Sequence, residues 1–134
     1  MLLNINKETR LYSAKAIADG KIRVDNSYVF LLQNTQNEKM KYFFDIIPPK
    51  GMEGKIIIAK PSKPFMATPG MRKKKVVTLR TTEHLAEDTR QDTIIPITIH
   101  AYALDSDGKK SEKISVYRKS IFIYPKESVL SKIK

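Results

Sequence analysis

The sequence predicts an all-β fold, an antiparallel β-sandwich of about seven to eight short strands. Short runs rich in Ile, Val, Thr, Tyr and Phe recur along the chain, and these side chains fit a pleated, half-buried surface. Gly, Pro, Asn and Asp separate the runs, and helical spacing is confined to the end of the chain. We expect an Ig-like topology, although the chain has neither the Cys nor the Trp of an antibody-type core.

The strongest strand signal is a hairpin made of residues 92–104 and 114–124. Alternate residues over 95–103 are Ile or Ala and share one face, while His100 lies on the opposite face. The intervening Asp107-Gly108 supplies the positive φ that hairpin turns need. A hairpin cannot bury its apolar face alone, so the other strands must form a second layer.

The remaining expected strands, in chain order, cover residues 2–5, 10–13, 21–35, 40–47, 55–59 and 73–80. Residues 61–70 contain three prolines and are expected to form a stiff loop. Residues 83–91 are polar and are expected to be a helical turn or an open connection. The basic tail over 126–134 has helical spacing.

The bulk composition indicates one domain spanning residues 1–134. Lys and Arg number 25 against 14 Asp and Glu, which gives a net charge of +11. This excess suits nucleic acid, an anionic membrane surface or an acidic partner. The chain has no cysteine, so it can hold no disulfide, thiol nucleophile, zinc ribbon or cysteine-bound cluster.

No apolar run has the length of a membrane span, and the first residues lack a signal-peptide pattern. Strand-like residues begin directly after Met1. We therefore expect a domain excised from a larger protein.

The chemistry-bearing residues are sparse, and we expect no catalytic or cofactor-binding residue. His84 and His100 are the two histidines, and no nucleophile elbow, metalloprotease helix or phosphate-binding glycine loop is present. His100 is expected to be a half-exposed strand residue, and His84 a solvated loop residue. Residues 105–112 faintly resemble a calcium loop, but Lys109 and Lys110 would repel a cation, so a plain hairpin turn is favoured.

Soft ligands for Cu(I) are the one metal alternative. Met66, Met71 and His84 are the copper candidates, and Met40 and Met52 could add to them. Methionine more often fills gaps in a core or a loop, so we predict that this chain has no metal site.

The densest basic run is Arg72-Lys-Lys-Lys75, and more lysines precede it. The candidate interaction surface consists of Lys60, Lys63, Arg72, Lys73, Lys74 and Lys75. A nucleic-acid surface would interleave aromatic residues with such charges, and the run has none, so we do not expect nucleic acid as a partner. A solvated strand edge or a surface facing anionic lipid fits better.

Several segments carry a resemblance to a known family. Residues 19–34 form its opening strand, and residues 57–61, 96–101 and 119–125 continue the likeness. Together they resemble the C-terminal Ig-like domain of the FixG/CcoG family of cytochrome c oxidase accessory proteins.

This resemblance implies a parent protein in the bacterial inner membrane, with several spans and a [4Fe-4S] segment upstream of this domain. It implies that the domain lies on the periplasmic side, tethered through that upstream part, and holds no cofactor itself. The expected role is a non-catalytic accessory module for cbb3-type oxidase assembly. The expected partners are oxidase subunits, assembly factors or the parent's own membrane part, with an anionic membrane surface as a further possibility. The alternatives are a periplasmic copper-binding domain and a basic nucleic-acid-binding β-domain.

Overall fold

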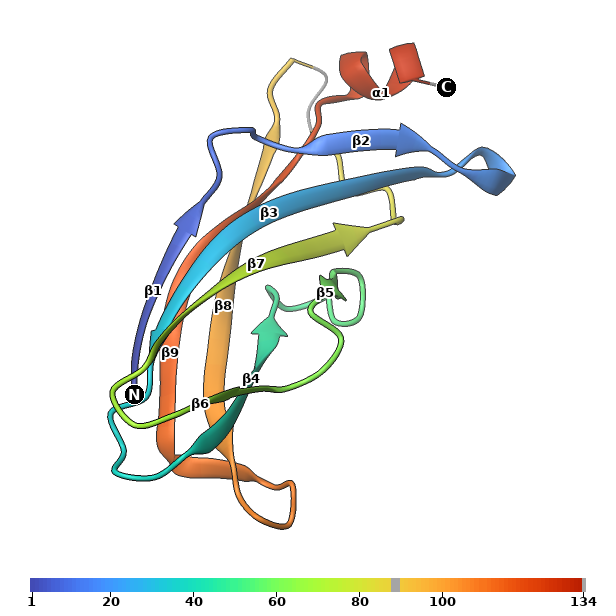
Figure 1. Ribbon diagram of the computed structural model, residues 1–134. Helices are drawn as coiled ribbons and strands as arrows, with labels where there is room; N and C mark the ends of the chain where they lie inside the picture. Colours follow the sequence, from blue (N-terminus) through green and yellow to red (C-terminus); the bar gives the residue numbers. More distant parts are fainter. Residues whose placement is uncertain (88–89, 134) are drawn as a thin grey trace.

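The computed structural model describes residues 1–87 and 90–133, which form nine strands, a 3₁₀ turn and a C-terminal helix (Figure 1). The elements are β1 (Leu2–Lys7), β2 (Ser13–Ala16), η1 (Ala18–Gly20), β3 (Ile22–Gln33), β4 (Met40–Ile47), β5 (Ile57–Lys60), β6 (Phe65–Ala67), β7 (Arg72–Thr81), β8 (Thr93–Leu104), β9 (Lys110–Tyr124) and α1 (Glu127–Ile133).

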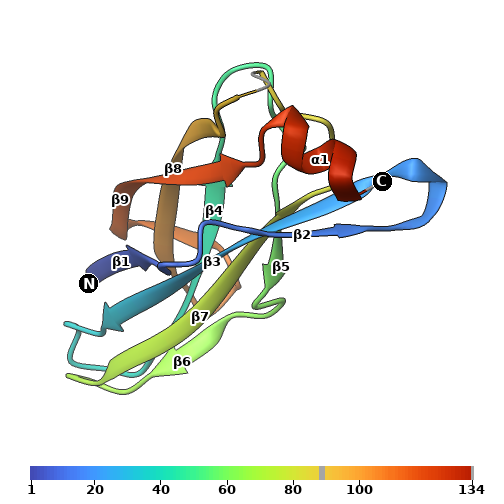
Figure 2. The same cartoon turned by 90° about the horizontal axis from the view of Figure 1, so that it is seen from above.

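These strands form two antiparallel sheets packed face to face (Figure 2). Sheet A has the order β1-β3-β7-β5, and β2 pairs with the part of β3 that β1 leaves free. Sheet B has the order β6-β4-β8-β9. The predicted all-β sandwich is confirmed.

The core lies between the sheets and follows the alternation seen in the sequence. The predicted inner face of β8 is confirmed, because Ile95, Ile97 and Ile99 are all buried. Phe30 of β3 and Phe44 of β4 meet across the core with ring centroids 5.0 Å apart. Helix α1 closes one end of the sandwich by burying Leu130, as the helical spacing of the tail predicted.

The expectation that residues 61–70 form only a loop is wrong. Phe65–Ala67 forms β6, which pairs with Met40–Tyr42 at the edge of sheet B. Phe65 and Ala67 are buried, whereas Met66 between them is exposed. The strand is only three residues long and is flanked by prolines, and three residues are too few to show an alternating pattern in the sequence.

Two strands have boundaries that differ from the prediction by more than two residues. The second extended piece lies at Ser13–Ala16 instead of 10–13, because the chain leaves the sheet between β1 and β2. Lys7 Nζ holds this excursion by donating to the carbonyl oxygens of Arg10 and Leu11. Strand β9 begins at Lys110, which pairs with Leu104 before the register shifts. The polar connection expected over 83–91 includes residues 88 and 89, which lie outside the described residues.

The outer edge of β9 is bonded to side chains from the opposite sheet. The Asn26 amide, on the inner face of β3, donates to the Ile123 carbonyl at 2.9 Å and accepts from the Ile123 N–H at 2.8 Å. The Tyr28 hydroxyl donates to the Ile121 carbonyl at 2.7 Å. In return, Arg118 Nε of β9 donates to the Leu3 carbonyl of β1 at 3.1 Å. The two sheets are therefore joined along this side by hydrogen bonds as well as by apolar packing.

This edge also explains how Pro96 fits in the middle of β8. Pro96 lies opposite Ile121, whose carbonyl points away from β8 to Tyr28. Pro96 thus occupies a position that requires no N–H toward β9.

Replacing Asn26 by Ala is expected to lower the free energy of unfolding by about 2–4 kcal/mol, because both backbone groups of Ile123 lose their partner in a buried place. Urea unfolding measures the loss. The matched control is Asn6→Ala on the exposed face of β1, which is expected to change stability by less than about 0.5 kcal/mol. Equal effects of the two substitutions would contradict the role assigned to Asn26.

Tyr28 predicts a pH dependence of stability. Burial raises the pKa of its phenol, so the folded state favours the neutral form. That contribution is complete below the unfolded pKa of about 10 and is lost as the pH rises toward the folded pKa. Stability measured by urea unfolding should therefore fall above about pH 10, and the fall should be shallower in Tyr28→Phe.

Candidate functional site

Four polar residues in the described part of the chain are buried, and each is hydrogen-bonded to another part of the fold. They are Asn26, Asn34, Thr81 and Thr93. Thr81 Oγ1 accepts from the Glu83 N–H at 3.1 Å, and Thr93 Oγ1 accepts from the Glu87 N–H at 3.0 Å. No buried side-chain N or O among the described residues lacks a hydrogen-bond partner. The interior thus presents no unpaired polar group to a ligand.

Asn34 is the most connected of these residues. Its Nδ2 donates to the carbonyls of Glu38 and Ala67 at 2.9 and 2.8 Å. Its Oδ1 accepts from the Gln36 N–H at 2.9 Å and from the Tyr42 hydroxyl at 2.7 Å. One amide therefore joins the end of β3 to β4 and β6. The sequence indicated only a polar turn here.

The two histidines lie apart and have ordinary structural neighbours. His100 occupies the outer face of β8, where its ring stacks on Tyr117 with centroids 4.3 Å apart and planes 5° apart. His84 lies in the connection between β7 and β8, pairs with Glu127 of α1 and meets the edge of the Tyr124 ring. The positions predicted for both residues, mid-strand and loop, are confirmed.

A small polar cluster on the outer face of sheet B was not predicted from the sequence. Asp45 of β4 accepts from the Tyr102 hydroxyl at 3.1 Å and pairs with Lys110. Burial, with the nearby Asp45 carboxylate, raises the pKa of Tyr102 to about 12. The Lys110 ammonium also lies 5.1 Å from the Tyr102 ring centroid. This cluster closes on itself and fixes the β8–β9 hairpin against β4.

The copper candidates do not form one ligand set. Met66 lies in β6 and Met71 in the turn before β7, whereas His84 follows the other end of β7. The 10 residues of β7 separate Met71 from His84 by about 30 Å. The described residues contain no group of three or more His, Cys, Asp or Glu side chains that could hold a metal ion.

The calcium-like segment is a hairpin turn, as expected. Asp105 Oδ1 accepts the N–H groups of Asp107 and Lys109 at 2.9 and 2.8 Å. Gly108 has a φ of 79°, which the turn requires. The carboxylate of Asp105 is thus used by its own turn.

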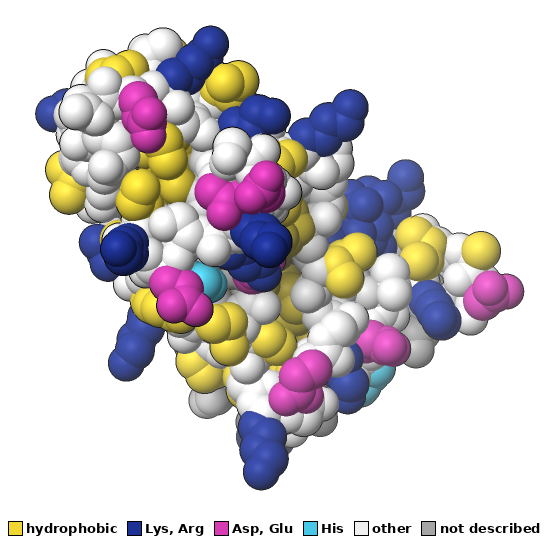
Figure 3. All heavy atoms as spheres, turned by 90° about the horizontal axis from the view of Figure 1, so that it is seen from below, with side chains coloured by type: hydrophobic (Ala, Val, Ile, Leu, Met, Phe, Trp, Pro, Cys, Tyr) yellow, Lys and Arg dark blue, Asp and Glu magenta, His cyan; other side chains and the backbone are white. Residues whose placement is uncertain are grey.

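A hollow of about 560 Å³ lies beside this hairpin, between the β3–β4 turn, β6 and β8. It is lined by Glu38, Lys39, Met40, Lys41, Met66, Leu104, Asp105, Ser106, Ser111 and Ile114. From this end of the molecule, acidic, basic and apolar side chains are interspersed (Figure 3). The mixture of charges does not select one class of ligand.

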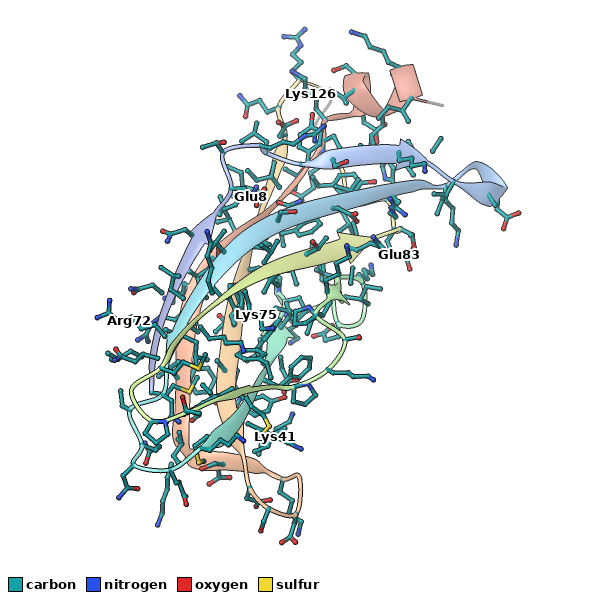
Figure 4. The ribbon with its side chains drawn as sticks, in the orientation of Figure 1. Glu8, Lys41, Arg72, Lys75, Glu83 and Lys126 are labelled. Atoms are coloured by element: carbon teal, nitrogen blue, oxygen red, sulfur yellow. The ribbon has the colours of Figure 1, made fainter. Side chains whose placement is uncertain are left out.

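The basic run of β7 is divided between two surfaces, because strand residues alternate. Arg72 and Lys74 lie opposite Gln33 and Leu31 on the outer face of sheet A. Lys73 and Lys75 lie opposite Leu32 and Phe30, which face the core. Figure 4 shows Arg72 pointing away from the sandwich and Lys75 lying on its inner side.

Lys75 marks a cationic border of the sandwich. Its ammonium lies 5.2 Å from the ring centroid of Phe65 in β6. Lys60 ends β5, and Lys63 lies in the connection from β5 to β6. We define the cationic edge as Lys60, Lys63, Lys73 and Lys75, on the side where the short strands β5 and β6 border their sheets.

Comparison with known proteins points to one family. Residues 1–125 match the family described as "IG-like fold at C-terminal of FixG, putative oxidoreductase". The FixG-related protein from Vibrio parahaemolyticus has a similar crystal structure, with a TM-score of 0.61 at 13% identity, covering 91% of this chain and 94% of that chain. No curated protein matches the sequence.

Two further solved structures are more distant. An MSP-domain-like protein from Caenorhabditis elegans has a TM-score of 0.37 at 14% identity and covers 73% of this chain and 84% of its own. A protein from Archaeoglobus fulgidus has a TM-score of 0.45 at 12% identity, with coverage of 93% and 97%.

The distance between the copper candidates leads to a direct test. His84→Ala is expected to leave the affinity for Cu(I) at the wild-type value, because His84 cannot share an ion with Met66 or Met71. Titration against a competing Cu(I) chelator measures this affinity. A loss of more than about tenfold in His84→Ala, with the fold intact, would show that the histidine and the methionines meet.

Proposed function

Because its sequence matches that family over residues 1–125, the chain belongs to the FixG C-terminal Ig-like domains, and we propose that it is a non-catalytic interaction module. We assign it to a membrane-bound accessory protein of cbb3-type cytochrome c oxidase assembly. In this proposal the domain lies on the periplasmic side of the inner membrane, and electron transfer belongs to [4Fe-4S] clusters on another part of the protein.

The observation that supports this role most directly is the use of the buried polar groups. The side-chain amide of Asn26 is hydrogen-bonded to the backbone of β9, and that of Asn34 joins β3, β4 and β6. An active site generally keeps polar groups in a cavity and points them at a substrate. Here the polar interior serves the fold, so contact is left to the surface.

Membrane attachment is a separate part of the proposal. None of the helices in the described part of the chain is long and apolar enough to cross a membrane. In the proposal, any anchor lies on polypeptide outside this chain.

The cationic edge is the surface that we propose for protein contact. Four lysines lie there beside two short edge strands, β5 and β6. An edge strand offers free backbone groups to a partner strand, and surrounding positive charge selects an acidic partner and speeds its approach. The expected partner is an acidic surface on an oxidase subunit, an assembly factor or the parent's own membrane part.

Charge reversal tests this assignment. The immobilised domain is expected to retain detergent-solubilised cbb3-type oxidase, and Lys63→Glu/Lys73→Glu/Lys75→Glu should reduce retention at least several-fold, because repulsion replaces attraction at the edge. Urea unfolding of the variant checks that the fold persists.

The matched control reverses three lysines elsewhere, Lys15→Glu/Lys109→Glu/Lys113→Glu, and produces the same change in net charge. It should retain oxidase as the wild type does. Equal losses in the two triple variants would show that only net charge matters, and failure of the wild-type domain to retain oxidase would remove the proposed partner.

A further inference from the structure

The outer face of sheet A carries a strip of apolar, amide and basic side chains. Strand pairing places its members in three rows across β1, β3 and β7. The rows are Leu2–Gln33–Arg72, Asn4–Leu31–Lys74 and Asn6–Val29–Val76. We call these nine residues the outer strip. Strand spacing gives it a span of about 10 Å across the strands and about 13 Å along them.

Three of the four apolar members of the outer strip are exposed to solvent, and the fourth, Val29, is half-buried. Leu2 is 56% exposed, Leu31 41% and Val76 55%. Leu2 and Leu31 also line a hollow of about 320 Å³ with Asn4, Leu32, Gln33 and Arg72. Exposed apolar side chains that lie together on one face are a common mark of a contact surface.

The charge of the strip has one sign. Arg72 and Lys74 are its charged members, and none of the nine residues is acidic. Two carboxylates lie on the same face beyond the strip: Glu8, whose N–H bonds to the Ser27 carbonyl, and Asp25, which is paired with Arg80 at 2.8 Å. The strip itself therefore combines exposed apolar side chains with positive charge.

We propose that the outer strip docks on an anionic lipid bilayer. Leu2, Leu31 and Val76 would enter the boundary between headgroups and acyl chains, while Arg72 and Lys74 would contact lipid phosphates. An open sheet face suits this partner, because a bilayer surface requires no shape-complementary pocket. This inference goes beyond the protein contact proposed above and uses a different surface, since the cationic edge lies on the inner and border positions.

A second apolar area on the outer face of sheet B lacks this combination. Ile47, Pro96 and Ile121 line or adjoin a hollow where Lys119 is the one charged side chain. Ile94 continues this area and is 63% exposed. It provides a control surface that is apolar and carries less charge.

Vesicle flotation tests the proposal with no other protein present. The wild-type domain should float with vesicles of phosphatidylcholine and phosphatidylglycerol and should not float with pure phosphatidylcholine. Arg72→Gln/Lys74→Gln should weaken partitioning by about 30-fold, since each cation near an anionic surface contributes about fivefold. Leu31→Thr, which keeps a residue suited to strands, should weaken it by about tenfold.

The matched controls are Lys15→Gln/Lys109→Gln for charge and Ile94→Thr for apolar area, and both should float as the wild type does. Equal loss in the controls, or no binding to anionic vesicles, would overturn the proposal. Dimerisation that Leu31→Thr abolishes, or binding to duplex DNA without binding to vesicles, would assign the strip to a second copy or to nucleic acid instead. Oxidase capture is measured separately, so failure of either proposal leaves the other standing.

Discussion

The hydrogen bonds between β3 and the outer edge of β9 are the constraint on which the rest of the structure depends. Apolar packing alone would let two sheets slide over each other, because it has little directional preference. The Asn26 amide and the Tyr28 hydroxyl are directional, and they bond to defined backbone groups of Ile123 and Ile121. Their burial makes any other register costly, since these groups would lose their partners away from water. The alignment of the sheets in turn sets the positions of the cationic edge and the outer strip.

Strand alternation converts one basic run into two surfaces with different chemistry. Read as a string, residues 72–75 form a single positive block. In β7, Arg72 and Lys74 join an apolar face, whereas Lys73 and Lys75 turn to the side where Lys75 lies against Phe65. A run of charges in a strand therefore cannot be treated as one binding patch.

The sequence was sufficient to predict the sandwich, the β8–β9 hairpin and the closing helix, because each follows from local alternation, turn residues or helical spacing. It was not sufficient for β6, whose three residues are too few to show a period and are flanked by prolines. The hydrogen bonds that Asn26 and Asn34 make between the sheets could not be predicted from the sequence either. Asn26 bonds to a residue 97 positions away, a pairing that appears only when both sheets are assembled. The separation of His84 from Met66 and Met71 has the same origin, since the length and direction of β7 decide it.

The capping of β9 has a consequence for behaviour at high concentration. This strand is 15 residues long and borders its sheet, so it could template the stacking of further chains into cross-β fibres. Asn26 and Tyr28 bond to backbone groups of Ile123 and Ile121, and Arg118 reaches from β9 to β1. The borders on the other side are four-residue and three-residue strands, too short to seed such growth. A substitution that removes these hydrogen bonds would therefore reduce the solubility of the protein before it reduced binding to a partner.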